Sequence, residues 1–333
     1  MKLNLVCAAL VLAGVSVTSS VSAQQCLTRQ AVVGFLPKMD TDPYFHVARD
    51  GAMEAQKEIG GRFIQQAPST ATADAQIEFI NSLVAQKVDV LAISGTDANA
   101  LAPALKRAAS QGVRVISYDS DVAKTSRAIF VNQAKSDSLA IQMLESMGAL
   151  INYTGEFAIL SSTPTATNQN AWIALMKKRL ASEPKFAKMK LVQVAYGEES
   201  EQVNQQQALA LAEAFPNLKG IIVPAGIGLP AAARALEQSG GIKTIKLTGL
   251  APASFMKKYI QSNVAQDIWW NVTDLGYLTY HVAQALAQCK ITGKAGETFT
   301  AGRLGQYTVG ADGEVVLGEA KVVTPKNLEE FKF

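Results

Sequence analysis

Short apolar runs alternate with amphipathic stretches along most of the chain. In the first half, runs rich in Val and Ile predict β-strands, and the stretches between them carry apolar residues at helical spacing. The predicted strands cover residues 30–37, 61–67, 88–94, 113–119 and 128–133, and the predicted helices cover 43–59, 73–86 and 99–111. This alternation is typical of right-handed βαβ units that build a parallel sheet.

A second series of the same kind follows a predicted helix at 135–152. Its strands are expected at 156–162, 190–197, 220–225, 244–250 and 265–270, and its helices at 168–181, 201–215, 229–239 and 252–262. Two similar series predict a duplicated α/β architecture. After a last helix at 274–289, Asp312 and Gly313 indicate a tight turn between alternating residues, so we expect a β-hairpin there.

The first residues depart from this pattern. Residues 1–23 combine a positive charge at Lys2, an apolar run and small residues at Val21 and Ala23, which is the order of a secretory signal peptide. The apolar run is shorter than the roughly 20 residues that a membrane-spanning helix needs. We expect cleavage after Ala23 and a protein that is exported to the periplasm.

Charge and cysteine content narrow the choice of function. The formal net charge of +3, with both signs interspersed, argues against nucleic acid as a ligand and against a strongly basic membrane patch. Cys26 and Cys289 lie beyond the predicted signal peptide, at a spacing that matches no metal or CxxC motif. In an oxidising compartment they can form a disulfide, and two separate buried thiols fit the sequence equally well.

One glycine-rich turn matches a dinucleotide-binding pattern. Residues 226–231, GIGLPA, follow a predicted strand and satisfy G-x-G-x-x-[GA]. A nucleotide site also needs an acidic residue after the next strand to hold the ribose hydroxyls, but no Asp or Glu lies between Gly241 and Ser262. We therefore expect no cofactor, and a turn whose backbone can approach a smaller ligand.

Catalytic motifs are missing from the sequence. His46 and His281 fall on predicted helices, and neither a G-x-S-x-G nor an H-E-x-x-H motif occurs. A glycosidase needs two carboxyl groups across a cleft; Asp119 and Asp121 form a carboxylate pair at one strand end, and the strand ends of the second half carry amides, threonines and a proline instead of a second acid. We expect neither an enzyme nor a metal site.

The residues that follow the predicted strands suit a small sugar. Ligands of parallel sheets bind at the carboxyl ends of the strands, and polar and aromatic residues gather there. The aromatic candidates are Tyr44, Phe45, Trp172, Trp269 and Trp270, and the polar candidates are Lys38, Asp119, Asn168, Gln169 and Asn271. Aromatic faces stack on sugar rings while fixed polar groups bind hydroxyls. Packing in the core explains Trp172 and Trp269 equally well.

Longer stretches carry a resemblance to a known family. From "VVGFLPKMDTDPYFHVARDGAMEAQKEIG" through "DVLAISGTDANALAPALKRAASQGVRVISYDSD" to its end, the chain resembles periplasmic sugar-binding proteins of the ribose-binding class. The segments "ILSSTPTATNQNAW", "WWNVTDLGYLTYHVAQAL" and "GETFTAGRLGQYTVGADGEVVLG" are most similar to the branch that holds rhamnose-binding proteins and autoinducer-2 receptors.

The resemblance implies a type I periplasmic binding protein: an α/β fold of two Rossmann-like lobes with parallel sheets, joined by a hinge of several crossovers. These crossovers are expected near 126–133, 248–253 and 270–273, with a short return near 290. The N-terminal lobe then comprises 24–130 with 272–291, and the C-terminal lobe 131–271 with 292–333. The resemblance also implies a monomer that closes on one small sugar and presents it to the membrane permease of an ABC transporter or to a sensory receptor.

Two sets of residues match family positions. Asp119 matches the acid that binds sugar hydroxyls in ribose-type proteins, and Tyr44 and Phe45 match its stacking aromatics. Lys38, Asp119, Gln169 and Pro224 match four positions of the autoinducer-2 receptor pattern.

Two positions depart from the receptor pattern, which has aspartate where this chain has Asn168 and alanine where it has Gly226. Asparagine removes a negative charge and adds a hydrogen-bond donor beside the ligand. The segment "TNQN" is more similar to rhamnose-binding proteins. We therefore expect rhamnose or a similar deoxyhexose, with autoinducer-2 as the alternative, and we expect Trp270 and Asn271 at the lobe junction to complete the site.

Overall fold

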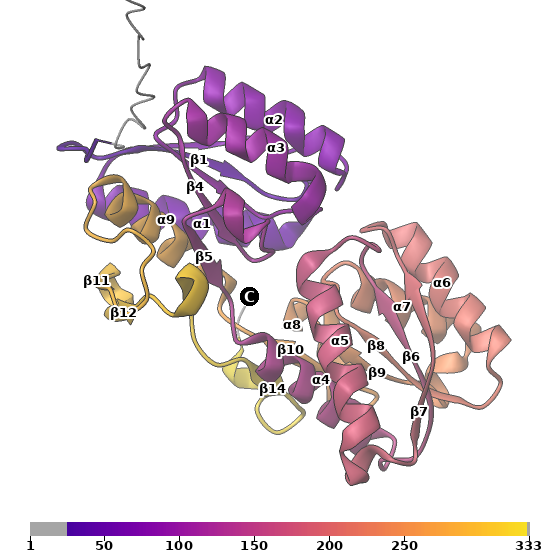
Figure 1. Ribbon diagram of the computed structural model, residues 1–333. Helices are drawn as coiled ribbons and strands as arrows, with labels where there is room; N and C mark the ends of the chain where they lie inside the picture. Colours follow the sequence, from indigo (N-terminus) through magenta and orange to yellow (C-terminus); the bar gives the residue numbers. More distant parts are fainter. Residues whose placement is uncertain (1–24, 332–333) are drawn as a thin grey trace, which may run out of the picture.

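Two six-stranded sheets form the centres of two lobes in the computed structural model, which describes residues 25–331 (Figure 1). The first sheet has the order β13-β5-β4-β3-β1-β2 and contains β1 (Val32–Leu36), β2 (Arg62–Gln65), β3 (Val90–Ile93), β4 (Arg114–Tyr118), β5 (Ile129–Asn132) and β13 (Glu314–Val316). All its strand pairs are parallel. The predicted signal peptide lies outside the described residues.

The second sheet repeats this arrangement in the order β14-β10-β9-β8-β6-β7. Its strands are β6 (Gly155–Ser161), β7 (Met189–Tyr196), β8 (Leu218–Val223), β9 (Lys246–Gly249), β10 (Ala265–Trp269) and β14 (Lys321–Val323). Only β14 runs antiparallel to its neighbour. The predicted α/β fold with two Rossmann-like lobes is confirmed.

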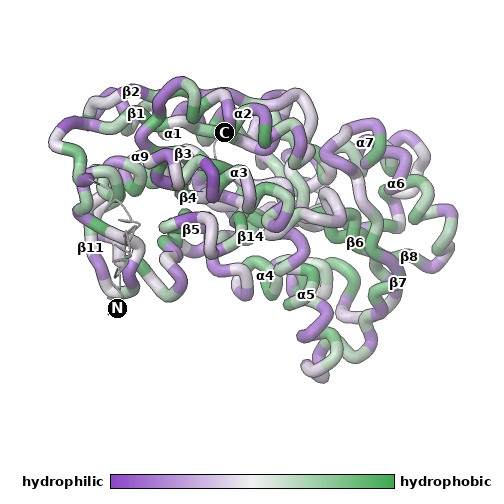
Figure 2. Tube along the Cα trace, turned by 45° about the horizontal axis from the view of Figure 1, so that its top comes forward, coloured by the Kyte–Doolittle hydropathy of each residue, from purple (hydrophilic) through white to green (hydrophobic). Residues whose placement is uncertain are grey.

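Helices cover both sheets. They are α1 (Pro43–Ile59), α2 (Ala73–Ala85), α3 (Ala98–Ser110), α4 (Ser136–Leu150), α5 (Thr167–Ser182), α6 (Glu201–Ala214), α7 (Gly228–Ser239), α8 (Ala253–Gln261) and α9 (Val272–Ala287). Hydrophobic residues gather along the strands, as Figure 2 shows for β6 and β8, and every residue of β3 and β4 is buried. Among the described residues, no helix is long and apolar enough to span a membrane.

The chain passes between the two sheets at three places, which form the hinge. These are the segment from β5 through α4 to β6, the link from β10 to α9, and the link from β13 to β14. The crossover expected near 248–253 is wrong, because β9 leads through α8 to β10 in the same sheet. The return expected near 290 lies instead between β13 and β14.

The tail between α9 and β13 departs from the prediction. The expected hairpin at Asp312 is wrong: the turn exists, but β13 pairs with β5, and β12 (Gln306–Thr308) pairs with β11 (Thr298–Thr300). The backbone N–H of Arg303 in this segment donates to the α9 residue Tyr277 at 3.2 Å. Residues 292–316 therefore lie with the first lobe, not with the second as predicted.

Helices α1 and α9 cross in backbone contact. A Cβ atom at Gly51 would stand 1.8 Å from the carbonyl oxygen of Thr273, and one at Gly276 would stand 1.7 Å from that of Ala48. Real side chains do not fit at such distances, so glycine is required at both positions. The crossing holds α9 against α1. Helix α9 directly follows the hinge, and α1 begins beside the carboxyl end of β1.

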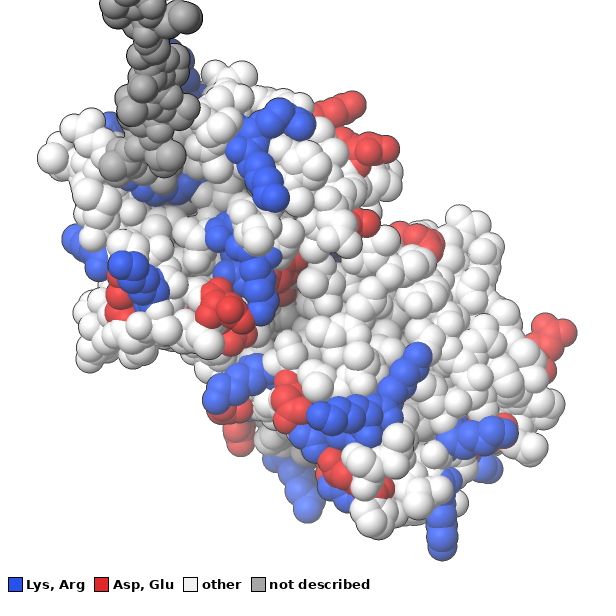
Figure 3. Space-filling model, in the orientation of Figure 1, with Lys and Arg blue, Asp and Glu red and all other residues white. Residues whose placement is uncertain are grey.

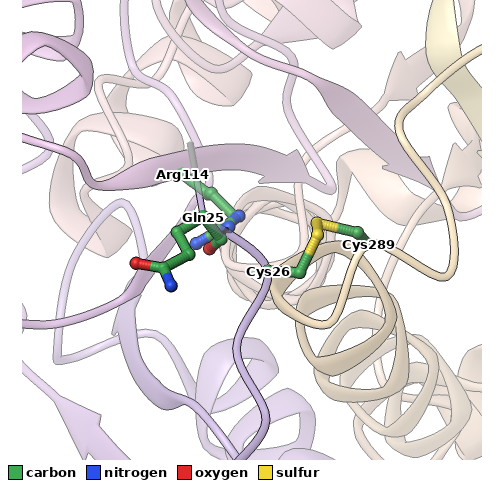
Figure 4. The surroundings of a disulfide bond; sticks show 4 residues. All are labelled: Gln25, Cys26, Arg114 and Cys289. Atoms are coloured by element: carbon green, nitrogen blue, oxygen red, sulfur yellow. Dashed lines mark hydrogen bonds between the residues drawn. A yellow bond between two sulfur atoms is a disulfide. The ribbon is translucent and has the colours of Figure 1, made fainter. Parts of the chain in front are cut away.

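A disulfide joins the segment before β1 to the end of α9 (Figure 4). Cys26 precedes β1 and Cys289 follows α9, and 263 positions of sequence separate them. The backbone next to the bond is paired as well, since Leu27 N donates to the carbonyl of Ala287 at 2.9 Å. Of the two alternatives for these cysteines, the structure contains the disulfide.

Acidic and basic side chains lie close together over both lobes on the face seen in Figure 3. Several form ion pairs at the surface, such as Lys258 with Glu237 at 2.6 Å and Arg303 with Glu54 at 2.8 Å. This interspersed surface agrees with the low formal net charge of the sequence.

Candidate ligand-binding site

A cleft of about 1050 Å³ separates the carboxyl ends of the two sheets. Nine of the ten residues predicted for the site line it, namely Lys38, Tyr44, Phe45, Asp119, Asn168, Gln169, Pro224, Gly226 and Trp270. They follow β1, β4, β6, β8 and β10, so the strand ends bring together residues that lie far apart in the sequence.

Asp119 directly follows β4 in the left-handed backbone region, with φ 59°. Its carboxylate accepts a hydrogen bond from the Tyr44 hydroxyl at 3.0 Å and another from the Ser94 hydroxyl at 2.7 Å. The ammonium of Lys38 stands 3.9 Å away, and both side chains are almost fully buried. Sequence reasoning did not select Ser94 for the site, although it stands at the end of β3. The carboxylate is thus fixed in place and can still accept from a ligand hydroxyl.

Asn168 connects the two lobes. Its side-chain oxygen accepts from Lys38 Nζ at 3.4 Å and from Ser120 Oγ at 3.2 Å, both of which belong to the first lobe. A second contact lies nearby, where the Thr165 hydroxyl donates to the carbonyl of Thr96 at 3.3 Å. These contacts place Asn168 at the edge of the cleft where the lobes already meet.

The second lobe contributes an amide and a carbonyl group. Gln169 Nε2 donates to the carbonyl of Pro224 at 3.2 Å, and Gln169 Oε1 is a buried acceptor without a hydrogen-bond partner among the described residues. A ligand hydroxyl would satisfy it. At Gly226 a Cβ atom would meet nothing within 4 Å, so the glycine leaves free space in the cleft.

Aromatic rings form one wall of the cleft. Trp270 Nε1 donates to the Tyr44 hydroxyl at 3.2 Å, and the two rings meet edge to face with centroids 6.2 Å apart. Phe45 packs edge to face against Tyr44 at 5.1 Å. Trp172, 1% exposed, is part of the core and lines the cleft, whereas Trp269 lines the cleft and packs against Phe331.

Asn271 does not line the cleft, so its predicted role in the binding site is wrong. Its side-chain oxygen accepts from the backbone N–H of Asp274 at 3.0 Å and caps the N-terminus of α9. Asparagine is a preferred N-cap residue, and this local hydrogen bond uses the group that the prediction assigned to a ligand.

Two buried acids in the cleft were not predicted. Asp42 caps α1 through a hydrogen bond from Tyr44 N at 2.9 Å, and Glu199, after β7, accepts from the Ser162 hydroxyl. Both line the cleft, from opposite lobes. Burial raises the pKa of Asp42 to about 7, and the negative charge of Glu199 contributes to the shift. Glu199 stands three residues after the end of β7, so the strand-end argument applied to β7 would have found it.

Asp42→Asn is expected to stabilise the protein at pH 8 and to have less effect at pH 5. The raised pKa means that Asp42 stays protonated in the folded protein up to about pH 7, whereas in the unfolded chain it loses its proton near pH 4. The folded protein therefore becomes less stable relative to the unfolded chain as the pH rises from about 4 to about 7. Asparagine keeps the N-cap and removes the charge. Thermal denaturation should show a melting temperature raised by a few degrees at pH 8.

The control for this variant is Asp97→Asn, which changes the N-cap of α3 outside the cleft. An equal shift of the Asp42→Asn melting temperature at both pH values would contradict the titration of Asp42.

Comparison with known proteins supplies a family and relatives. The model of a family described as periplasmic binding protein domain matches residues 33–294. Among curated proteins, the D-ribose/D-allose-binding protein of Pseudomonas aeruginosa is 25% identical over 228 residues, which cover 64% of this chain and 69% of that protein.

Solved structures resemble the chain over nearly its whole length. An ABC transporter solute-binding protein from Clostridium phytofermentas, with bound L-rhamnose, is 35% identical with a TM-score of 0.88, covering 91% of this chain and 98% of that one. LsrB from Clostridium saccharobutylicum, in complex with AI-2, is 23% identical with a TM-score of 0.84, covering 91% of this chain and 100% of that one. At that lower identity the second likeness concerns the fold alone.

Proposed function

Since the chain belongs to the periplasmic binding protein domain family, we propose that it is the substrate-binding component of an ABC sugar importer and binds rhamnose or a similar deoxyhexose between its lobes. The family consists of substrate-binding proteins and not of enzymes. One observation carries the proposal: Lys38 in the first lobe contacts both Asp119 of the same lobe and Asn168 of the second lobe.

The chemistry of the cleft suits a deoxyhexose. Asp119 accepts from hydroxyls, Lys38 donates to them, and the Asn168 amide can do both. The remaining lining includes the apolar side chains of Leu250, Ile268 and Val272, which suit a methyl group in place of a hydroxyl. The likeness to the L-rhamnose-bound protein, at 35% identity, supports this ligand.

Ligand binding closes the lobes in this proposal. A sugar that contacts Lys38 and Asp119 in the first lobe and Gln169 and Pro224 in the second is bound more tightly when the lobes approach, so it shifts the hinge equilibrium toward the closed form. The closed form is then presented to the membrane permease, or to a sensory receptor. Export to the periplasm through the signal peptide at 1–23 belongs to the same proposal.

Titration calorimetry of the mature protein against L-rhamnose, L-fucose, D-ribose and autoinducer-2 tests the ligand. We expect the tightest binding for rhamnose, near micromolar or better. Three or four hydrogen bonds to charged groups, at about 1.5–3 kcal/mol each, are enough for the roughly −8 kcal/mol of a micromolar complex. A strong binding signal with autoinducer-2 and none with rhamnose would favour the alternative function, an autoinducer-2 receptor. That alternative is suggested by Lys38, Asp119, Gln169 and Pro224.

A further inference from the structure

The cleft extends beyond the polar residues around Asp119. Its volume of about 1050 Å³ lies at the top of the range of about 300–1,000 Å³ that is usual for small-molecule pockets. The lobes meet at one edge of this cleft, where Asn168 and Thr165 contact the first lobe at 3.4 Å and 3.3 Å. The cleft therefore has room for more than one sugar ring.

Phe255 projects into the additional space. It lines the cleft from α8 and is 54% exposed, more than the other exposed large hydrophobic side chains of the described chain, Met53 at 37% and Leu209 at 40%. Its neighbours on α8, including Met256 and Ile260, are buried in the core of the second lobe. The helix is therefore held in place by its other face, while the Phe255 ring remains available to a ligand.

Arg234 on α7 is a polar residue that lines the same cleft. Glu237 on α7 accepts from Lys258 Nζ at 2.6 Å and from the Tyr259 hydroxyl at 2.7 Å, which ties α7 and α8 side by side. Arg234 precedes Glu237 by three residues and Phe255 precedes Lys258 by three residues. Residues at this spacing share a helix face, so Arg234 and Phe255 each lie one turn nearer the cleft than this bridge.

The guanidinium of Arg234 keeps hydrogen-bond donors for a ligand. It pairs with Glu201 at 2.6 Å through one nitrogen, and both side chains line the cleft. A guanidinium has five N–H donors in a planar fork, which suits the adjacent hydroxyls of a sugar ring. An aromatic face beside such a fork is suited to a pyranose, whose C–H groups stack on the ring while its hydroxyls accept from the arginine.

We propose that Phe255 and Arg234 form an outer subsite for the second ring of a disaccharide whose first ring occupies the site around Asp119. The protein then binds rhamnosyl disaccharides as well as free deoxyhexose. This inference rests on the proposed sugar-binding function and adds a larger class of ligand to it.

The test compares L-rhamnose with a rhamnosyl-glucose disaccharide by titration calorimetry, using wild-type protein and Phe255→Ala. We expect the wild type to bind both sugars. Phe255→Ala should weaken disaccharide binding about tenfold, equivalent to about 1.4 kcal/mol, and leave rhamnose binding within about twofold. Phe255→Trp should restore disaccharide binding, because it restores the aromatic face. Leu209→Ala, a similarly exposed residue outside the cleft, is the matched control and should change neither affinity.

The outcomes separate the two proposals. Wild-type protein that binds rhamnose but not the disaccharide would overturn the outer subsite and leave the proposed function standing. Equal losses for both sugars in Phe255→Ala would also overturn it, since the ring would then act in lobe closure. Folded wild-type protein that binds neither sugar would overturn the proposed deoxyhexose ligand and the outer subsite together.

Discussion

Asp119→Asn is expected to weaken sugar binding at least 100-fold. Tyr44 and Ser94 hold the carboxylate in position beside the Lys38 ammonium. The carboxylate is almost fully buried, so ligand hydroxyls would donate hydrogen bonds to it away from bulk water. Two hydrogen bonds to an ionised group are together worth about 3 kcal/mol or more, which corresponds to roughly 100-fold in the dissociation constant. Titration calorimetry with the best ligand of the panel measures this loss.

Asparagine is the suitable replacement because it tolerates the left-handed backbone of Asp119, at φ 59°, better than alanine does. Asp40→Asn is the matched control: it removes one negative charge two residues after Lys38 in the sequence, from an exposed side chain that does not line the cleft. If Asp119→Asn binds the sugar within about threefold of wild type, the ligand sits elsewhere in the cleft, because loss of the charged hydrogen-bond acceptor should weaken binding at least 100-fold.

Removal of the Cys26–Cys289 disulfide is expected to lower the melting temperature by about 5–15 °C. The bond closes a loop of most of the chain, with a sequence separation of 263, and closing so long a loop restricts the unfolded state strongly. Loss of such a bond typically costs about 2–5 kcal/mol. Calorimetric unfolding of Cys26→Ser/Cys289→Ser, compared with oxidised wild type, measures the difference.

Sugar affinity should remain within about twofold of wild type in the same double variant. Cys26 precedes β1 and therefore lies at the amino ends of the strands, whereas the cleft lies at their carboxyl ends. Wild type treated with a reductant should melt like the double variant. An unchanged melting temperature in both samples would show that the packing of α9 on α1, and not the disulfide, holds α9 in the first lobe.

The sequence was sufficient to predict the elements that depend on local patterns. The strands of both α/β series and all nine predicted helices have bounds within two residues of the prediction, because their periodicity and caps are local properties. The pairing of β13 with β5 was not predictable in this way. A three-residue strand carries too little pattern to show which of two sheets it joins, and its partners lie far away in the sequence, as Phe130 does from Glu314.

The predicted and unpredicted parts of the site differ for a similar reason. Asp119, Gln169 and Pro224 were found because each lies at the end of a predicted strand or in the segment that follows it. Asn271 met the same criterion, but its side chain is used by the helix that begins there. The proximity of Asp42 and Glu199 depends on how the lobes face each other, which no local pattern in either segment specifies.

The mixed origin of the first sheet has a consequence for biosynthesis. Its strands β1 to β5 come from the beginning of the chain, but α9, Cys289 and β13 come from beyond residue 270. The second sheet, apart from its edge strand β14, is continuous from β6 to β10. The chain is made from its amino end, so the second lobe has nearly all of its residues before the first lobe does. The first lobe is complete only near the end of translation. Until the segment beyond residue 270 has been added, the edge of β5 is open because β13 is missing, and Cys26 has no disulfide partner.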